Sequence, residues 1–335
     1  MAGALLAWFL SVLLTRTYER WYRAADKHTI VITIVILYAL TGVMLVQSHN
    51  LKAFVSEHNL SLDRQIAAEY PYTNITLDDA IRLNKKFDAE VMKNQYYDRC
   101  VYVEKGSKWW CKFKDMNKSA SASILIIGNC WAPNHARIIH ESCKNRSRVM
   151  TLYGYPGCDV LVETSKPNCK TTFAGYVQYI KETTPDYLFV IVKYQQYLTE
   201  QSESVNGESF VKQFYTRTQS LQKLVKRRIF ILDILPQFIP NLVCVLNSKL
   251  SQQKIFNQTE LLHPFPVDFT RSVLRKAIAS CEKCTLISYD DVFGNGSSFR
   301  FFDENTKVTF FAGHHISPYG LRKVAPIYEK ICASF

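Results

Sequence analysis

Short apolar runs alternate with amphipathic stretches from residue 123 to the end of the chain. Patterns typical of buried strands cover SILIIG (123–128), SRVMTLYG (147–154), YLFVIVK (187–193), RIFILDIL (228–235) and TLISYDDVF (285–293). Apolar residues at helical spacing predict helices over 133–143, 173–182, 208–226, 241–250 and 267–280, and a last one after Ser317 and Pro318. This alternation predicts an α/β fold whose parallel sheet is covered by helices on both sides.

The stretch before residue 121 has a different pattern. Residues 77–94 carry apolar side chains at helical spacing, and VYVEKGSKWWCKF (101–113) has the pattern of a β-hairpin. Cys100 and Cys111 stand where a disulfide would join the two arms of that hairpin. We therefore assign 48–120 to a stalk and hairpin module and 121–335 to the main α/β domain.

The N-terminal region indicates a membrane anchor. Thr29 to Val46 is an uncharged and mostly apolar run, close to the roughly 20 residues that a helix needs to cross a bilayer. We predict a transmembrane helix over 28–47, after a short apolar segment and basic loop over 1–27. The loop carries Arg16, Arg20, Arg23 and Lys27, which places it in the cytoplasm and everything after the helix in the lumen or outside the cell.

Glycosylation sequons and cysteines agree with this topology. All sequons follow the predicted helix, at Asn59, Asn74, Asn117, Asn145, Asn257 and Asn295. All 10 cysteines follow it as well, as an oxidising compartment favours. The sequence thus predicts a membrane glycoprotein of the secretory pathway or plasma membrane with disulfide bonds.

Composition narrows the function classes. Hydrophobic residues make up 47% and charged residues 21%, which is ordinary for a globular protein. The net charge is +12, but lysines and arginines are scattered and form no basic tract, so we expect no nucleic acid partner and a basic surface that faces anionic lipid or glycan. No set of His and Cys residues has metal-ligand spacing, and the motif CEKC alone is a weak signal for a metal site. We therefore expect no metal and no bound cofactor.

Two segments carry residues with catalytic chemistry. The first predicted strand ends in Gly128, Asn129 and Cys130, and the loop before the last helix contains His314 and His315. Functional sites of such sheets form outside the carboxyl ends of the strands. A cysteine in the first turn and a histidine in the last therefore predict a nucleophile and a general base.

These segments resemble a known family. IIGNCWAPNH is similar to the first block of SGNH hydrolase and acyltransferase domains, and FFAGHHISPYG to their last block, Asp-x-x-His-Leu-Ser. The chain most resembles the C-terminal SGNH domain of the acyltransferase 3 family, with FLSVLLTRTYERWY and the apolar run similar to the end of that family's membrane part. The resemblance implies an SGNH-hydrolase-like, flavodoxin-like three-layer sandwich with a parallel sheet.

The resemblance also implies acyl transfer, or ester hydrolysis, at carbohydrate hydroxyls. A membrane acyltransferase domain, in cis or in trans, would deliver the acyl group from a donor such as acyl-CoA. Cys130 stands in the place of the nucleophilic serine and His315 in the place of the general base, while Gly128, Asn129 and Gly154 would form the turn and the oxyanion hole. Two positions depart from the family: Ala312 stands where an aspartate is expected, and no asparagine directly follows YLFVIVKYQQY.

Other interpretations stay open. Cys130 could be half of a disulfide; if it is free, another cysteine must be free too, and Cys244 is then expected as a buried core thiol. The other eight cysteines could form four bridges, with Cys100–Cys111, Cys158–Cys169 and Cys281–Cys284 as local pairs.

Trp109 and Trp110 could stack on a sugar or pack in the hairpin, and Asp290 and Asp291 could approach the site or cap a strand. The rival function is a catalytically degenerate glycan- or protein-binding domain; the chain could also be a fragment of a longer polytopic acyltransferase.

Overall fold

The computed structural model describes residues 25–33, 38, 75–103, 109–164, 166–194, 207–253, 257–263, 267–294 and 298–335. The chain divides into two compact units, Met1–Pro71 and Tyr72–Phe335. In the first unit residues 27–33 are helical, and most of the predicted transmembrane helix 28–47 lies outside the described residues. Within the residues that are described, no helix has the length and apolar character needed to cross a membrane.

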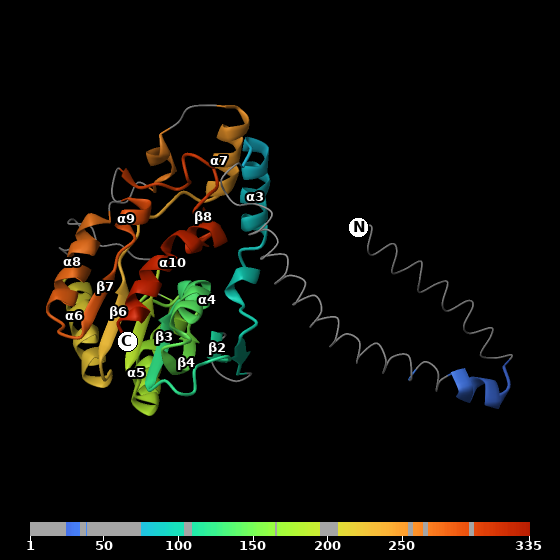
Figure 1. Ribbon diagram of the computed structural model, residues 1–335, viewed down its shortest axis with the longest axis horizontal. Helices are drawn as coiled ribbons and strands as arrows, with labels where there is room; N and C mark the ends of the chain where they lie inside the picture. The colour runs from blue at the N-terminus through green and yellow to red at the C-terminus, as the bar shows by residue number, and fades with distance from the viewer. Residues whose placement is uncertain are drawn as a thin grey trace. The chain divides into compact units, whose positions relative to one another are not determined.

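The second unit is built on a seven-stranded, mostly parallel sheet (Figure 1). Five strands run parallel, in the spatial order β4-β3-β5-β6-β7, and the antiparallel pair β1-β2 extends the sheet beyond β4. The strands are β1 (Cys100–Tyr102), β2 (Trp109–Phe113), β3 (Ala122–Gly128), β4 (Ser147–Gly154), β5 (Tyr187–Ile191), β6 (Arg228–Leu232) and β7 (Cys284–Ile287). The parallel strands therefore have the flavodoxin-like order 2-1-3-4-5.

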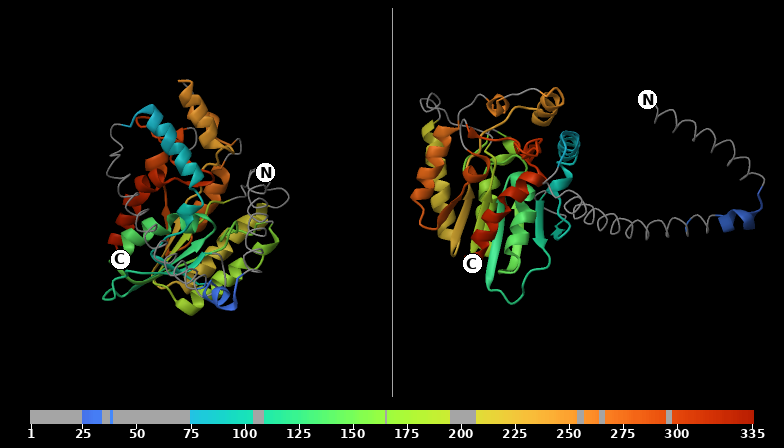
Figure 2. Two further views of the ribbon diagram at one scale, coloured as in Figure 1. Left: turned by 90° about the vertical axis from the view of Figure 1, so that its right-hand side faces the viewer. Right: turned by 45° about the horizontal axis from the view of Figure 1, so that its top comes forward.

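Helices cover both faces of this sheet (Figures 1 and 2). Along β3, Ile124 and Ile126 enter one core and Leu125 and Ile127 the other, because successive side chains of a strand point to opposite faces. The first core contains side chains of α3 (Leu77–Ala89), α4 (Trp131–Cys143), α7 (Leu242–Ser251) and α10 (Pro318–Ala333). The second contains side chains of α5 (Thr172–Thr183), α6 (Gly207–Leu224) and α8 (Asp268–Ala279).

Several predicted boundaries need correction. The predicted strand over 285–293 ends at Ile287, and Asp290–Phe293 forms the short helix α9 instead. The cause is a local turn: Asp290 donates its main-chain N–H to Ser288 Oγ, and its carboxylate pairs with Arg271. The strands that begin at 187 and 228 also end earlier than predicted, at Ile191 and Leu232.

The last helix begins as its sequence predicts. Ser317 is the N-cap of α10, since its side chain accepts a hydrogen bond from Gly320 N at 3.1 Å, and Pro318 occupies the first turn. Directly before it, β8 (Phe311–Ala312) and β9 (His315–Ile316) form a small antiparallel pair. This pair carries the histidine of the candidate site.

The cysteine pairing is mostly as predicted. Cys100–Cys111, Cys158–Cys169 and Cys281–Cys284 are disulfides, and Cys143–Cys332 is a further one that joins α4 to α10. Cys130 and Cys244 are free, as the open alternative required. The prediction that Cys244 is a buried core thiol is wrong: α7 buries the face that holds Val243, Leu246 and Asn247, and Cys244 lies on the exposed side.

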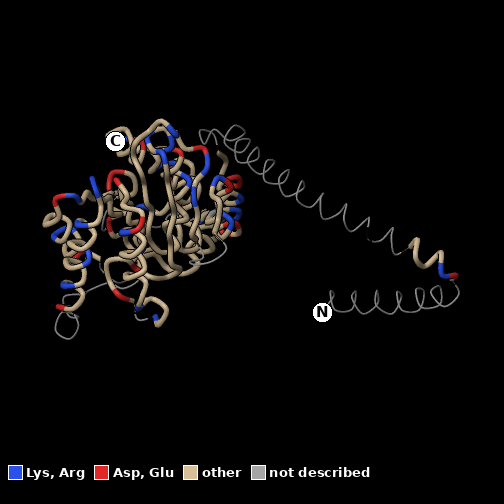
Figure 3. The backbone as a smooth tube through the Cα atoms, turned by 90° about the horizontal axis from the view of Figure 1, so that it is seen from below, with Lys and Arg blue, Asp and Glu red and all other residues tan. Residues whose placement is uncertain are grey.

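Charged residues of both signs are spread around the periphery of this unit (Figure 3). Lys and Arg segments lie beside Asp and Glu segments on the surface helices, and the strands in the centre carry few charges. This distribution is that of a solvated surface and does not form a single basic face.

Candidate functional site

Cys130 sits in a tight turn between β3 and α4, of which it is the N-cap. Gly128 ends β3, and a Cβ atom at this position would lie 1.9 Å from the main-chain oxygen of Ile191 on β5. Only glycine permits that approach. Gly154 pairs with Gly128 from the other side, and a Cβ there would lie 3.3 Å from Gly128 O. The role of Gly154 as an oxyanion donor stays a prediction.

Asn129 organises the turn through its buried side-chain amide. Nδ2 donates to Asp159 Oδ1 at 3.1 Å and to the main-chain oxygen of Lys193 at 2.7 Å. Oδ1 accepts from the main-chain N–H groups of Trp131 at 3.1 Å and Lys193 at 3.3 Å. Because both amide hydrogens bind protein oxygens, this side chain fixes the turn and the end of β5.

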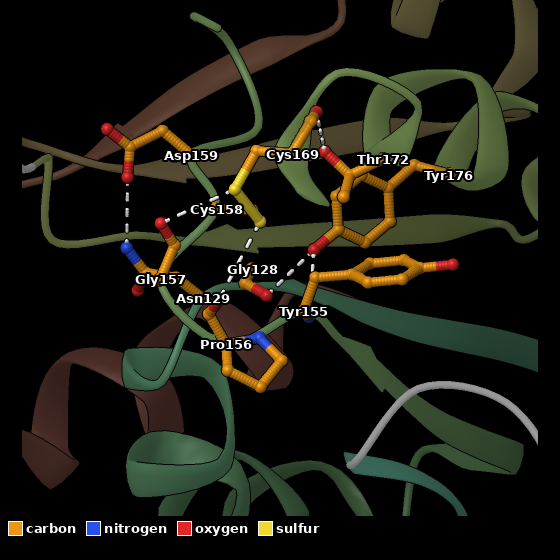
Figure 4. The surroundings of a disulfide bond; sticks show 10 residues. All are labelled: Gly128, Asn129, Tyr155, Pro156, Gly157, Cys158, Asp159, Cys169, Thr172 and Tyr176. Carbon is orange, nitrogen blue, oxygen red and sulfur yellow. Dashed lines mark hydrogen bonds between the residues drawn. A yellow bond between two sulfur atoms is a disulfide. The ribbon is translucent and has the colours of Figure 1, made fainter. Parts of the chain in front are cut away.

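A loop closed by a disulfide packs against the turn (Figure 4). The Cys158–Cys169 bond closes the loop that carries Asp159, whose carboxylate points at the Asn129 amide. Gly128 O accepts from the hydroxyl of Tyr176 at 2.8 Å and from the main-chain N–H of Tyr155 at 3.0 Å. The main chain on both sides of the turn is thus held before Cys130 begins the helix.

His315 reaches the same region through contacts from α4. The indole N–H of Trp131 donates to the main-chain oxygen of His314 at 2.9 Å. The side-chain amide of Asn134 binds both main-chain groups of Ile316, at 3.1 and 3.2 Å. These bonds join the residues on either side of His315 to the first turns of α4, so the structure brings the predicted nucleophile and base to the same part of the fold.

Among the residues that the structure describes, no carboxylate binds the imidazole of His315 or contributes to its pKa. Its Nε2 lies 2.9 Å from the side-chain nitrogen of Gln95, and its Nδ1 has no hydrogen-bond partner in the part of the chain that the structure describes. Ala312, at the expected aspartate position, is its register partner on β8. Burial and the charge of Lys193 lower the pKa of His315 to about 4, so the imidazole is neutral at neutral pH. His314 is exposed.

Cys130 is half-buried. Burial raises its pKa to about 11, and the positive charge of Lys193 opposes this rise. Asp159 raises the pKa of this thiol further, and Lys166 lowers it. At neutral pH Cys130 is therefore a thiol and needs a proton acceptor to react as a thiolate.

Sequence reasoning missed Lys193, which follows β5. Its ammonium nitrogen lies 3.9 Å from the ring centre of Phe238 and 5.8 Å from that of Trp131. Burial lowers its pKa to about 8, and Cys130 is the group that raises it again. The available signal was position: a charged residue directly after an apolar strand, beside the point where the strand order reverses.

Other predicted candidates have packing or ion-pair partners of their own. Trp109 is buried in the hairpin, and Trp110 donates to the hydroxyl of Tyr179, so the pair serves packing. Asp290 is held in ion pairs with Arg271 and Arg275. Over the described ranges, no group of three or more His, Cys, Asp or Glu side chains could hold a metal ion.

A turn with Cys130 after β3, the first of the parallel strands, and a histidine before the last helix give the arrangement of an SGNH-type domain. Residues 99–330 match the family described as "SGNH domain (fused to AT3 domains)", and the chain belongs to this family. The membrane part that the description names is not covered by this match.

Among solved structures, the periplasmic domain of a Salmonella ser. Paratyphi A lipopolysaccharide acetyltransferase is similar at 15% sequence identity. The alignment covers 65% of this chain and 85% of that domain, with a TM-score of 0.48. The comparison with curated protein sequences found no match.

Proposed function

We propose that the chain is a membrane-anchored, luminal SGNH domain that transfers acyl groups to carbohydrate hydroxyls, with Cys130 in place of the usual serine. The observation that carries this proposal is the free thiol of Cys130 at the helix-opening turn, together with His315 on the strand that α4 holds. Family membership supports the same class of reaction.

In this proposal Cys130 Sγ attacks the carbonyl carbon of the acyl donor. A C–S bond forms, the bond from the carbonyl to the donor's leaving group breaks, and a thioester remains on Cys130. His315 acts as the general base that the family pattern assigns to this position. The sugar hydroxyl then attacks the thioester: a C–O bond forms, the C–S bond breaks, and the hydroxyl proton passes to the sulfur, which restores the thiol. The donor, such as acyl-CoA, would act through a membrane acyltransferase domain in cis or in trans.

The cellular location is part of the proposal. The apolar run before residue 47 would anchor the domain, and the sequons would carry glycans on the luminal side. The sequon asparagines that the structure describes, Asn117, Asn145 and Asn257, are all exposed. The disulfides also fit an oxidising compartment.

A specific observation favours a second candidate, a glycan- or protein-binding domain without activity. The pKa of Cys130 is raised, the pKa of His315 is lowered, and no carboxylate of the described ranges orients the histidine. The raised pKa leaves little thiolate at Cys130, and the lowered pKa makes His315 a weaker base. The two candidates differ in one measurable property, the formation of a thioester on Cys130.

The test uses the full chain with Cys244→Ser, so that Cys130 is the only free thiol. The protein is treated with p-nitrophenyl acetate over a range of pH, and the adduct is mapped by mass spectrometry. We expect one acetyl group on Cys130, removable by neutral hydroxylamine and missing in Cys130→Ala. If folded protein stays unmodified up to pH 9 while the urea-unfolded chain is acetylated, the binding-domain candidate is correct.

A further inference from the structure

Lys193 occupies the position in the sheet where ligands of such folds bind. It follows β5, which is the neighbour of β3 at the point where the strand order reverses. Crevices outside the carboxyl ends of two such strands are the usual sites of doubly wound sheets. Cys130 stands at the end of one of these strands and Lys193 at the end of the other.

The main chain of Lys193 is fixed to the nucleophile turn. The Asn129 side chain binds both its N–H and its C=O, at 3.3 and 2.7 Å, and Asn129 directly precedes Cys130. A shift of the chain by one residue at the end of β5 would break both bonds. The backbone position of the lysine relative to the cysteine is therefore set by two hydrogen bonds from one amide.

Aromatic rings fix the direction of its side chain. The ammonium nitrogen lies over Phe238 at 3.9 Å and over Trp131 at 5.8 Å, and Trp131 is the residue after Cys130. Cation–π contacts of this kind hold an ammonium group without neutralising it. No carboxylate of the described residues contributes to the pKa of Lys193; the thiol of Cys130 does. Among the described residues, the charge of Lys193 lowers the pKa values of Cys130, His314 and His315.

We propose that Lys193 is a catalytic residue which accepts the thiol proton of Cys130 and then, as an ammonium ion, stabilises the charge that develops on the acyl oxygen. This inference rests on the proposed function and adds a residue to its site. It leaves His315 to serve the acceptor hydroxyl.

The step balances as follows. The Sγ–H bond breaks and an Nζ–H bond forms, while the sulfur electron pair forms the C–S bond. When the bond to the leaving group breaks, the ammonium returns its proton to that group, so that Lys193 ends the step neutral. The pKa values favour Lys193 over His315 as the acceptor of the thiol proton. The pKa of Cys130 is about 11, that of Lys193 about 8 and that of His315 about 4, so Lys193 is the better matched base.

The test measures the pH dependence of Cys130 acetylation by p-nitrophenyl acetate in the full chain with Cys244→Ser. We expect the rate in the parent protein to rise with a pKa of about 8. Lys193→Met should lower the rate at pH 8 about 100-fold, within the usual range for general base catalysis, and should move the profile toward the ionisation of the thiol itself. Lys193→Arg keeps a cation that cannot accept a proton, so it should also be slow at pH 8.

Lys166→Met is the matched control, because Lys166 also lowers the pKa of Cys130 but is exposed. We expect its rate to change less than about twofold. Circular dichroism and thermal melting check that each variant is folded, and absorbance at 240 nm reports the pKa of the thiol. If Lys193→Arg is fully active, Lys193 is not the proton acceptor. If the pH dependence of acetylation in Lys193→Met equals that of the parent, the inference as a whole is wrong. Both results require acetylation of the parent protein, whereas a parent that is not acetylated refutes the proposed function instead.

Discussion

Asn134 and Ile316 are joined by a pair of hydrogen bonds: the Asn134 amide donates to Ile316 O at 3.1 Å, and Ile316 N donates to Asn134 Oδ1 at 3.2 Å. Asn134 lies about one turn of α4 beyond Cys130, and Ile316 directly follows His315. The Asn134 side chain thus forms the two hydrogen bonds that a neighbouring strand would form with Ile316. It also ties the histidine to the helix that the cysteine begins.

Asn134→Ala should therefore lower both stability and the rate of Cys130 acetylation. The substitution leaves the N–H and C=O of Ile316 buried without these partners, which costs about 2 kcal/mol in the free energy of unfolding. Urea unfolding measures this loss, and mass spectrometry follows the acetylation. The control is Asn305→Ala, whose side chain is exposed and should change the free energy of unfolding by less than about 0.5 kcal/mol. Equal stability of the two variants would contradict the structural role of Asn134.

The turn that holds Cys130 could be predicted because its signals are local. An apolar strand, a glycine and a cysteine before a helix stand within eight residues, and the strand order that follows depends on patterns of the same kind. The bridge Cys143–Cys332 could not be predicted in this way, since its partners are 189 residues apart. Gln95 meets His315 across 220 residues and belongs to a segment that its sequence assigns to a stalk.

Lys193 shows a different limit. The strand pattern YLFVIVK includes it as a final strand residue, and nothing in that pattern tells whether its side chain meets solvent or the site. Its position depends on Asn129, on the ring of Phe238 and on the order of strands, which are tertiary features. The error at Cys244 has the same origin: NLVCVLN is apolar on all sides, and only packing decides which face α7 buries.

Gly128→Ala should disrupt the turn. The added Cβ would lie 1.9 Å from the main-chain oxygen of Ile191 and 3.0 Å from the Cβ of Ala132, so β3 and β5 must move apart. Such overpacking costs about 3 kcal/mol where backbone atoms are in the way. Gly175→Ala is the control: its nearest neighbour, at 3.1 Å, is the hydroxyl end of Tyr155, a side chain that can shift. Thermal melting should separate the two variants; similar melting temperatures would show that β5 accommodates the methyl group.

The Cys143–Cys332 disulfide should contribute more stability than Cys281–Cys284. It closes a loop with a sequence separation of 189 against 3, and the chain-entropy relation gives about 5 kcal/mol for the first and about 2 kcal/mol for the second. We therefore expect Cys143→Ala with Cys332→Ala to lower the midpoint of urea unfolding clearly more than Cys281→Ala with Cys284→Ala. A larger loss in the second double variant would show that local strain or packing outweighs loop closure here.

His135 should make the protein less stable as the pH falls below about 6.5. Its ring lies between Trp131 and Tyr289, with centroids 5.5 and 6.1 Å away, and Nδ1 donates to the main-chain oxygen of Trp131 at 2.8 Å. Burial lowers its pKa from 6.5 to about 3. Between these values the unfolded chain binds the proton and the folded chain does not, so acid favours unfolding.

The contribution of His135 to the free energy of unfolding at pH 5 should be about 2 kcal/mol less favourable than at pH 7. Urea unfolding of His135→Phe across this range should show a smaller pH slope than the parent protein. Burial also lowers the pKa of the more exposed His314, so His314→Gln should reduce the slope less than His135→Phe does. Identical slopes in His135→Phe and the parent would mean that other groups carry the acid sensitivity.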